Sequence, residues 1–136
     1  MPIAFWCVLV AGLLPVLTVA IAKASGRSGF DNHDPRGWLE KQSGRARRAD
    51  LAHRNHFVAF PFFAAGVLIA SHRSAPQARI DELAVVCVVA RILYTVCYLT
   101  DRATLRTLCW TIGFLTVIGL FLLPVFVHKP LATRSH

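Results

Sequence analysis

The stretch Ile3–Ala22, IAFWCVLVAGLLPVLTVAIA, contains no charged side chain. About 20 apolar residues in a helix cross the hydrocarbon core of a bilayer. Pro15 lies inside the stretch, and bilayer helices tolerate an internal proline. A cleaved signal peptide is the alternative, because the tripeptide Ala-Ile-Ala at 20–22 resembles a cleavage site. However, no Lys or Arg precedes the stretch, and it exceeds the roughly 7–15-residue apolar core of such peptides. We therefore expect a retained membrane-spanning helix.

The rest of the chain shares this apolar character. Hydrophobic residues make up 55% of its 136 residues and charged residues only 16%, whereas soluble domains carry about 25% charged residues. This composition argues against intrinsic disorder, nucleic-acid binding and a secreted disulfide scaffold. The four cysteines form no CxxC pair and lie inside apolar runs, which is typical of buried free thiols; they are Cys7, Cys87, Cys97 and Cys109.

Three further apolar runs follow, at about residues 49–71, 80–100 and 107–127. The polar stretch 23–48 between the first two runs is rich in glycine, so we expect it to be a loop. Four spans of about 20 residues with these connections use nearly the whole chain. We therefore predict one all-α membrane domain over residues 1–136, a bundle of four transmembrane helices with spans at about 3–22, 49–71, 80–100 and 107–127.

The excess of positive charge, 15 Lys+Arg against 7 Asp+Glu, lies mostly between the apolar runs. The positive-inside rule accounts for charges in such places, so they do not indicate nucleic acid as a partner. The first and third loops together hold nine Lys and Arg residues. The opposite side holds four, namely Arg73, Arg79, Lys129 and Arg134. We expect loops one and three to face the cytoplasm, with both termini on the opposite side.

Arg91 lies midway along the third run, ten residues from both Asp81 and Asp101. A cation at that depth costs about 2.5–3.5 kcal/mol on insertion scales, so we expect it to face the bundle interior or a wet cavity. Tyr94 and Tyr98 follow at i+3 and i+7 on the same helix face. This face indicates either a polar site for an anionic ligand or thiolate, or an internal hydrogen-bond network that holds the helices together. The residues alone leave both interpretations open.

The second run begins with polar turns. Arg48, Ala52 and Asn55 share one face, and the small Ala52 allows another backbone to approach. Asp50 and Arg54 are spaced i, i+4, as expected for an interfacial ion pair.

Two further groups of polar residues have simple explanations. His53 and His56 are spaced i, i+3 but have no third ligand nearby, so we expect no metal site. Arg102 and Arg106 are explained by positive-inside anchoring. A guanidinium from either could also fold over the mouth of the Arg91 site, where it could hold a carboxylate or favour a thiolate.

Several of these segments resemble the MAPEG family, the membrane-associated proteins of eicosanoid and glutathione metabolism. The resemblance lies in the order and placement of short motifs over about residues 30–110. These motifs are DNHDPR at 31–36, RADLAHRN at 48–55, FPF at 60–62, ARILYTVCYL at 90–99, and Arg102 and Arg106 before Trp110. Together with the layout of four spans, they are similar to the pattern of bacterial members.

The resemblance implies a homotrimer in a lipid bilayer, here a bacterial inner membrane. In catalytic members glutathione binds between neighbouring subunits near the cytoplasmic face, and an arginine activates or positions its thiol. Lipophilic substrates enter from the bilayer. By position, the resemblance assigns catalysis to Arg106, Tyr94 and Tyr98. It assigns glutathione binding to Asn55, Arg91 and Arg102.

The sequence departs from the family pattern at two positions on the second run. The glutathione-binding glutamate, three residues after the asparagine, is replaced by Val58. The arginine four residues before the asparagine is replaced by Leu51, and Arg48, one turn earlier, takes its place in the binding set. Without the glutamate, the glutathione ammonium lacks its natural partner, and loss of a buried charge partner costs a few kcal/mol.

Three functions remain open. The first is a glutathione- or thiol-dependent transferase or peroxidase acting on small lipophilic electrophiles. The second is a non-catalytic trimer of the same fold, either lipid-binding or structural. The third is a small transporter or channel, although the chain has no inverted repeat and no pair of broken helices.

Overall fold

The computed structural model describes residues 1–26 and 29–127, in which there are five helices and no strand. The helices are α1 (Ile3–Ser25), α2 (Pro35–Glu40), α3 (Gly44–His72), α4 (Gln77–Leu99) and α5 (Ala103–Phe126). All except α2 are long and apolar enough to cross a membrane. The prediction of an all-α bundle with four spans is therefore confirmed. Arg27, Lys129 and Arg134, which entered the charge comparison, lie outside the described residues.

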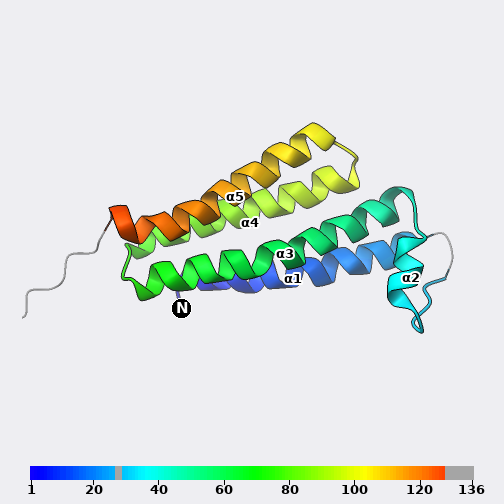
Figure 1. Cartoon of the computed structure of the whole chain (residues 1–136), viewed down its shortest axis with the longest axis horizontal. Helices are drawn as coiled ribbons and strands as arrows, with labels where there is room; N and C mark the ends of the chain where they lie inside the picture. Colours follow the sequence, from blue (N-terminus) through cyan, green and yellow to red (C-terminus); the bar gives the residue numbers. More distant parts are fainter. Residues whose placement is uncertain (27–28, 128–136) are drawn as a thin grey trace, which may run out of the picture.

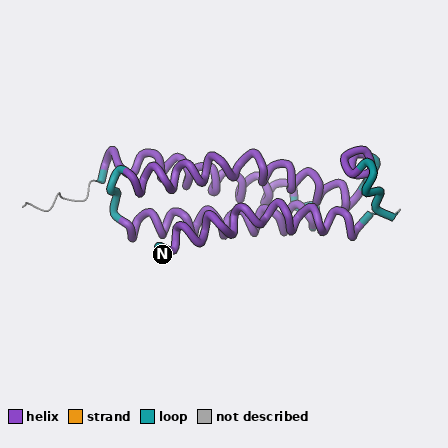
Figure 2. Tube along the Cα trace, turned by 90° about the horizontal axis from the view of Figure 1, so that it is seen from below, coloured by secondary structure: helices purple, strands orange, loops and turns teal. Residues whose placement is uncertain are grey.

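The four long helices run up and down as two antiparallel pairs (Figure 1). In one pair α1 lies beside α3, and in the other α4 lies beside α5. The pairs are close together at the end where α1 begins and α5 ends, and they diverge toward the end that carries α2. Figure 2 shows the same helices from below, and their axes are nearly aligned in this view. Loop one and the α4–α5 turn therefore lie at one end of the bundle.

Small residues allow the helices to pack closely, because they let two backbones approach. Five buried alanines belong to the main apolar core, and four of them lie on helices α1, α3 and α4: Ala4, Ala11, Ala70 and Ala84. Large apolar side chains instead lie on the outer faces, where Leu17, Leu68 and Leu115 are all exposed. Such faces suit lipid rather than water. The distribution is that of a protein surrounded by bilayer.

The beginning of α1 is tied to α4 by a carboxylate. The backbone N–H of Ala4 donates to Asp81 Oδ1 at 2.9 Å. The first N–H groups of a helix have no partner within the helix, and its N-terminus favours a negative charge. The hydrogen-bond acceptor for the N-terminus of α1 therefore comes from a neighbouring helix, α4, and not from the residues that precede α1.

The prediction that residues 23–48 form a loop was wrong at both ends of the segment and in its middle. At its beginning, α1 continues to Ser25. Residues 35–40 form α2, whose N-cap Asp34 accepts a hydrogen bond from the Gly37 N–H at 3.1 Å. At the end of the segment, α3 already begins at Gly44. Its first turns are polar, and ion pairs of Arg47 and Arg54 with Asp50 at 3.3 and 3.2 Å support them. Apolar runs mark where a helix enters lipid, not where it begins.

Candidate functional site

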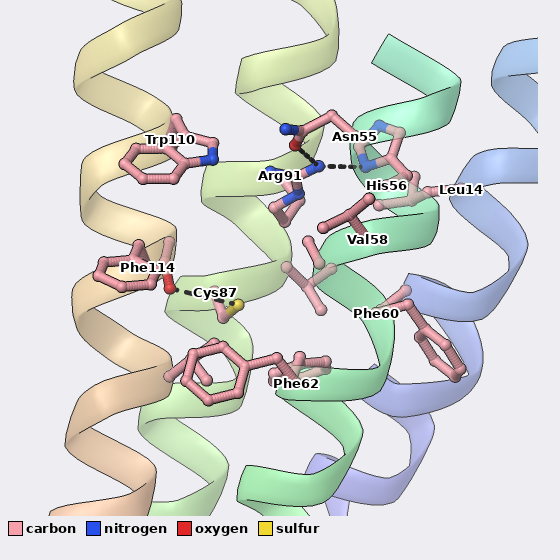
Figure 3. Close-up of a pocket in the computed structure, with 16 residues that line it drawn as sticks. Leu14, Asn55, His56, Val58, Phe60, Phe62, Cys87, Arg91, Trp110 and Phe114 are labelled. Atoms are coloured by element: carbon pink, nitrogen blue, oxygen red, sulfur yellow. Dashed lines mark hydrogen bonds between the residues drawn. The ribbon is translucent and has the colours of Figure 1, made fainter. Parts of the chain in front are cut away.

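Arg91 points into the bundle with only 6% of its surface exposed, which confirms its predicted inward orientation. Its Nη2 atom donates to Asn55 Oδ1 and to His56 Nδ1, each at 2.7 Å (Figure 3). Both acceptors come from α3, so this contact joins α4 to α3 between the two helix pairs. The structure thus brings together two residues of the predicted binding set, Asn55 and Arg91.

The contact with His56 fixes the state of its ring. A guanidinium can only donate, so His56 Nδ1 has to accept and the ring proton lies on Nε2. That nitrogen then donates to Thr95 Oγ1 at 2.7 Å, and the hydroxyl donates to the backbone oxygen of Arg91 at 2.9 Å. The result is a closed hydrogen-bond ring of Arg91, His56 and Thr95, in which both ring nitrogens of His56 and the Thr95 hydroxyl have partners.

His56 and Thr95 belong to the site although their sequence pattern does not predict it. The spacing of His56 from His53 suggests only a metal ligand, and Thr95 carries no motif. The available signals were weak: His56 directly follows Asn55, and Thr95 is spaced i+4 from Arg91. Only the register of α3 against α4 brings these two side chains to Arg91 and to each other.

Tyr94 and Tyr98 continue the site along one face of α4, as their i+3 and i+7 spacing from Arg91 predicts. The guanidinium carbon of Arg91 lies 4.5 Å from the Tyr94 ring centroid, and the Tyr94 and Tyr98 rings meet edge to face at 5.6 Å. Arg106, from α5, places its guanidinium carbon 4.6 Å from the Tyr98 ring centroid. We call these four residues the arginine–tyrosine ladder. It runs from the buried Arg91 to the half-buried Tyr98 and Arg106 near the α4–α5 turn.

The other two predicted binding residues, Arg48 and Arg102, are not part of this ladder. Arg48 donates from Nη2 to the Leu99 backbone oxygen at 3.3 Å, so it caps the last turn of α4. Its Nε is buried and has no hydrogen-bond partner in the part of the chain that is described. Arg102 is exposed at the start of α5, and its guanidinium makes no hydrogen bond or ion pair to the described residues.

Among the described residues, the site contains donors but no free carboxylate. Val58, at the position of the family glutamate, is 78% exposed on α3. The buried Asp50 is held by Arg47 and Arg54. The described residues of one chain therefore offer an anion several N–H and O–H donors, but they offer an ammonium group no obvious partner at this position.

A cavity of about 190 Å³ extends from Arg91 between the two helix pairs. Its polar end is formed by Asn55, His56 and Arg91, and the rest is apolar (Figure 3). Aromatic rings line it from both sides: Phe60, Phe62 and Phe63 from α3, and Trp110 and Phe114 from α5. The cavity can accept an apolar group with a single polar end.

The rings of both His53 and His56 have polar partners inside the bundle. His53 Nδ1 lies 2.8 Å from the Pro15 backbone oxygen, and His56 belongs to the Arg91 ring. Among the described residues there is no group of three His, Cys, Asp or Glu side chains that could hold a metal ion. The four cysteines are free thiols.

Comparison with known proteins gives one match. A family model described as the MAPEG family matches residues 3–126, which include all five helices. No curated protein and no solved structure matches the chain significantly.

Proposed function

The chain belongs to the MAPEG family, and from this premise we propose that it is a thiol-dependent transferase or peroxidase acting on small lipophilic electrophiles in a membrane. The observation that carries the proposal is the arginine–tyrosine ladder. It places a half-buried guanidinium, Arg106, against a phenol, Tyr98, near one end of the bundle. A water-soluble thiol and a lipid-soluble electrophile can both reach this end.

The ladder residues would act on the thiol by stabilising its anion. A thiol of pKa about 8.5 becomes more acidic beside a cation, and the thiolate is the nucleophile. Arg106 would supply the positive charge, and the Tyr94 and Tyr98 hydroxyls would donate hydrogen bonds. The thiolate then forms a bond to an electrophilic carbon, and the displaced electron pair leaves with the departing group. With a hydroperoxide, the thiolate attacks the terminal oxygen and the O–O bond breaks, so that the sulfur becomes a sulfenic acid and the alkoxide takes up a proton and leaves as an alcohol. A second thiol then attacks the sulfenic sulfur, which gives a disulfide and water.

The donors fit part of glutathione. Its two carboxylates and its thiolate match guanidinium and phenol groups, because such groups donate charge-assisted hydrogen bonds. Its ammonium group lacks the family carboxylate, since Val58 stands there. We therefore propose glutathione or a related anionic thiol as the cosubstrate, with glutathione bound more weakly than in members that carry the glutamate.

We further propose that the protein works as a homotrimer in a bacterial inner membrane, with loops one and three in the cytoplasm. Large apolar side chains on the outer faces of α1, α3 and α5 support contact with lipid or other protomers. The placement of loop one and the α4–α5 turn at one end of the bundle supports a shared side for their positive charges.

A non-catalytic trimer, lipid-binding or structural, is the second candidate. Two observations favour it. Val58 removes a ligand for glutathione, and the Arg91 guanidinium already binds Asn55 and His56 within the protomer. In this case the ladder would serve to hold α3, α4 and α5 together.

A conjugation assay separates the two candidates. Purified protein is mixed with glutathione and the electrophile 1-chloro-2,4-dinitrobenzene. In a second assay, cumene hydroperoxide replaces this electrophile. We expect turnover that falls roughly 10²-fold in Arg106→Ala, because one transition-state donor is lost. The matched control is Arg45→Ala, which removes an exposed cation near the start of α3. Absence of turnover with either substrate, together with no thermal shift at millimolar glutathione, would exclude the catalytic function as stated.

A further inference from the structure

Two of the four free thiols meet at the contact between α4 and α5. They are Cys97 and Cys109, and neither takes part in the site or the function described above. We propose that they form a modification site, in which a lipid-soluble hydroperoxide oxidises the pair to a disulfide that ties α4 to α5. The proposal does not rest on the catalytic function above, because it uses no glutathione and no residue of the arginine–tyrosine ladder.

The two cysteines are neighbours in space although they belong to different helices. The Cys97 side chain acts as a hydrogen-bond partner of the Cys109 thiol. Both residues are half-buried, and both are free thiols. Two adjacent free thiols are the reactants from which a protein disulfide forms.

The register of α4 against α5 explains how the thiols meet. The two helices come close at Ala90 and Gly113, where a Cβ added to the glycine would lie 3.8 Å from the alanine Cβ. Toward the α4–α5 turn, Cys97 lies two helical turns beyond Ala90, and Cys109 lies one helical turn beyond Gly113. Residues separated by whole turns share a helix face, so both cysteines lie on the faces that meet.

The tilt of helical side chains closes the remaining gap. Cys97 is seven residues from Ala90 and Cys109 is four residues from Gly113, so Cys97 lies roughly 4.5 Å nearer the turn. Cα–Cβ bonds tilt toward the N-terminus of their own helix. Because the helices are antiparallel, the Cys97 side chain leans away from the turn and the Cys109 side chain leans toward it. A disulfide needs Cα atoms about 4.4–6.8 Å apart, and an axial offset of this size between facing positions is compatible with that separation.

A groove leads from the outer surface of the bundle to Cys109. It has a volume of about 220 Å³ between α4 and α5, and its other lining residues are apolar. Val89, Leu93 and Ile112 line it and are exposed. Such a surface suits contact with lipid. An oxidant that dissolves in the bilayer can therefore reach the thiol pair.

The reaction needs one hydroperoxide for each pair of thiols. The thiolate of one cysteine attacks the terminal oxygen, so that an S–O bond forms, the O–O bond breaks, and the alkoxide takes up a proton and leaves as an alcohol. The second cysteine, also as a thiolate, attacks the sulfur of the resulting sulfenic acid, and the hydroxide that leaves becomes water with the proton of that thiol. The two thiols are thereby oxidised to a disulfide, and the hydroperoxide is reduced.

The disulfide would hold together the end of the α4–α5 pair that carries Tyr98 and Arg106. Tyr98 directly follows Cys97, and Arg106 precedes Cys109 by about one helical turn. The two helix pairs diverge toward this end of the bundle (Figure 1). With the α4–α5 turn in a reducing cytoplasm, as proposed above, a disulfide would persist only while oxidant is supplied. The bond would therefore form and break with the level of hydroperoxide in the membrane.

Peptide mass analysis tests the proposal. The purified and reduced full chain in a non-ionic detergent is treated with cumene hydroperoxide, and the remaining thiols are alkylated after denaturation. We expect a disulfide between the peptides of Cys97 and Cys109 within one chain, which dithiothreitol reverses. Cys97→Ala and Cys109→Ala should each abolish this bond, and the matched control Cys7→Ala, at a buried free thiol, should retain it. In the wild type, retention of both thiols, or a bond from either cysteine to another partner, would overturn the proposal.

Oxidation rates test the groove as the route of the oxidant. Each rate of thiol loss is divided by the rate of the same oxidant with dithiothreitol in the same detergent solution. After this correction, cumene hydroperoxide should react at least about tenfold faster than hydrogen peroxide, because it partitions into apolar surroundings. Val89→Phe, which fills the groove, should slow cumene hydroperoxide, whereas Val125→Phe, exposed on α5 outside the lining, should not. Equal corrected rates of the two oxidants, or an unchanged rate in a folded Val89→Phe protein, would overturn this route.

Discussion

Arg91 shows how a bilayer protein can keep a cation at depth when no carboxylate of the described residues lies in hydrogen-bonding range. The guanidinium donates to an amide oxygen and an imidazole nitrogen and stacks on a phenol. Each partner is neutral, so the cost of burying the charge is only partly offset. Arg91 therefore stabilises the helix contacts around it, and its uncompensated charge still favours the binding of an added anion.

Replacing Arg91 with leucine should destabilise the protein. Asn55 Oδ1 and His56 Nδ1 would lose their donor, and each unsatisfied buried group costs about 1–3 kcal/mol. The burial cost of the cation is removed at the same time, so we expect a net loss of about 2 kcal/mol, seen as a lower midpoint of thermal unfolding. Arg79→Leu, in an exposed pair with Glu82, should change stability by less than about 1 kcal/mol. Unchanged melting and unchanged ligand binding in Arg91→Leu would refute a role for the residue.

Thr95→Val tests the hydrogen-bond ring with almost no change in shape. The His56 Nε2–H would lose its acceptor, which should cost about 1–2 kcal/mol of unfolding free energy. Thr107→Val is the matched control, because the exposed Thr107 hydroxyl bonds only to the Ala103 oxygen in its own helix. Denaturation of both variants in the same detergent gives the comparison. Equal loss in the two would mean that the ring contributes nothing beyond a local helix contact.

The site could be predicted only in part from the sequence. Arg91, Tyr94 and Tyr98 share a face because of helix periodicity, and charge alone makes Arg91 turn inward. Asn55 came from a resemblance. His56 was missed, since its role depends on which residues of α3 and α4 lie at the same height, and sequence spacing within one helix does not contain that information.

At the scale of elements, the four long helices were predictable because about 20 apolar residues in water have no stable alternative to a membrane span. α2 was not predictable. A helix of six residues is too short to be stable alone, and it depends on Trp38 and Leu39, which are buried against the neighbouring core. Whether α2 forms is therefore decided by contacts with residues outside its own segment, such as Ala22 and Ala49.

The α1–α2 connection gives a test of that dependence. A Cβ on Gly26 would overlap the Trp38 ring, whereas a Cβ on Gly29 meets nothing within 4 Å. Gly26→Ala should therefore displace α2 and make the segment 29–43 more sensitive to limited proteolysis. Gly29→Ala should leave the cleavage rate close to that of wild type. Similar cleavage rates in the two variants would show that the Trp38 contact does not hold α2 in place.

At the scale of the whole molecule, the up-and-down path brings both strongly basic connections to one end. The residues near this end include Arg45, Arg48 and Arg106. At the opposite end, Arg73 lies in the connection between α3 and α4, and Arg79 lies in the first turn of α4. The asymmetry predicts how the protein lies across a membrane, because positively charged loops stay on the cytoplasmic side.

Labelling with a membrane-impermeant maleimide checks this orientation. In a background with Cys97 and Cys109 replaced by alanine, Ser43→Cys and Ser74→Cys place a thiol at exposed positions near opposite ends of the bundle. In intact bacterial cells we expect Ser74→Cys to react and Ser43→Cys to react only after permeabilisation. The reverse pattern would show that the charge asymmetry does not set the topology of this protein.

The bond between Ala4 and Asp81 has a consequence for how the protein is made. Its partners are 77 residues apart, so the beginning of α1 leaves the ribosome long before the carboxylate that completes it. During that interval the helix has to wait in the translocon or in lipid with α3 as its first neighbour. The end of the bundle where α1 begins is therefore closed only when α4 arrives, and a nascent chain stalled earlier would carry an open bundle.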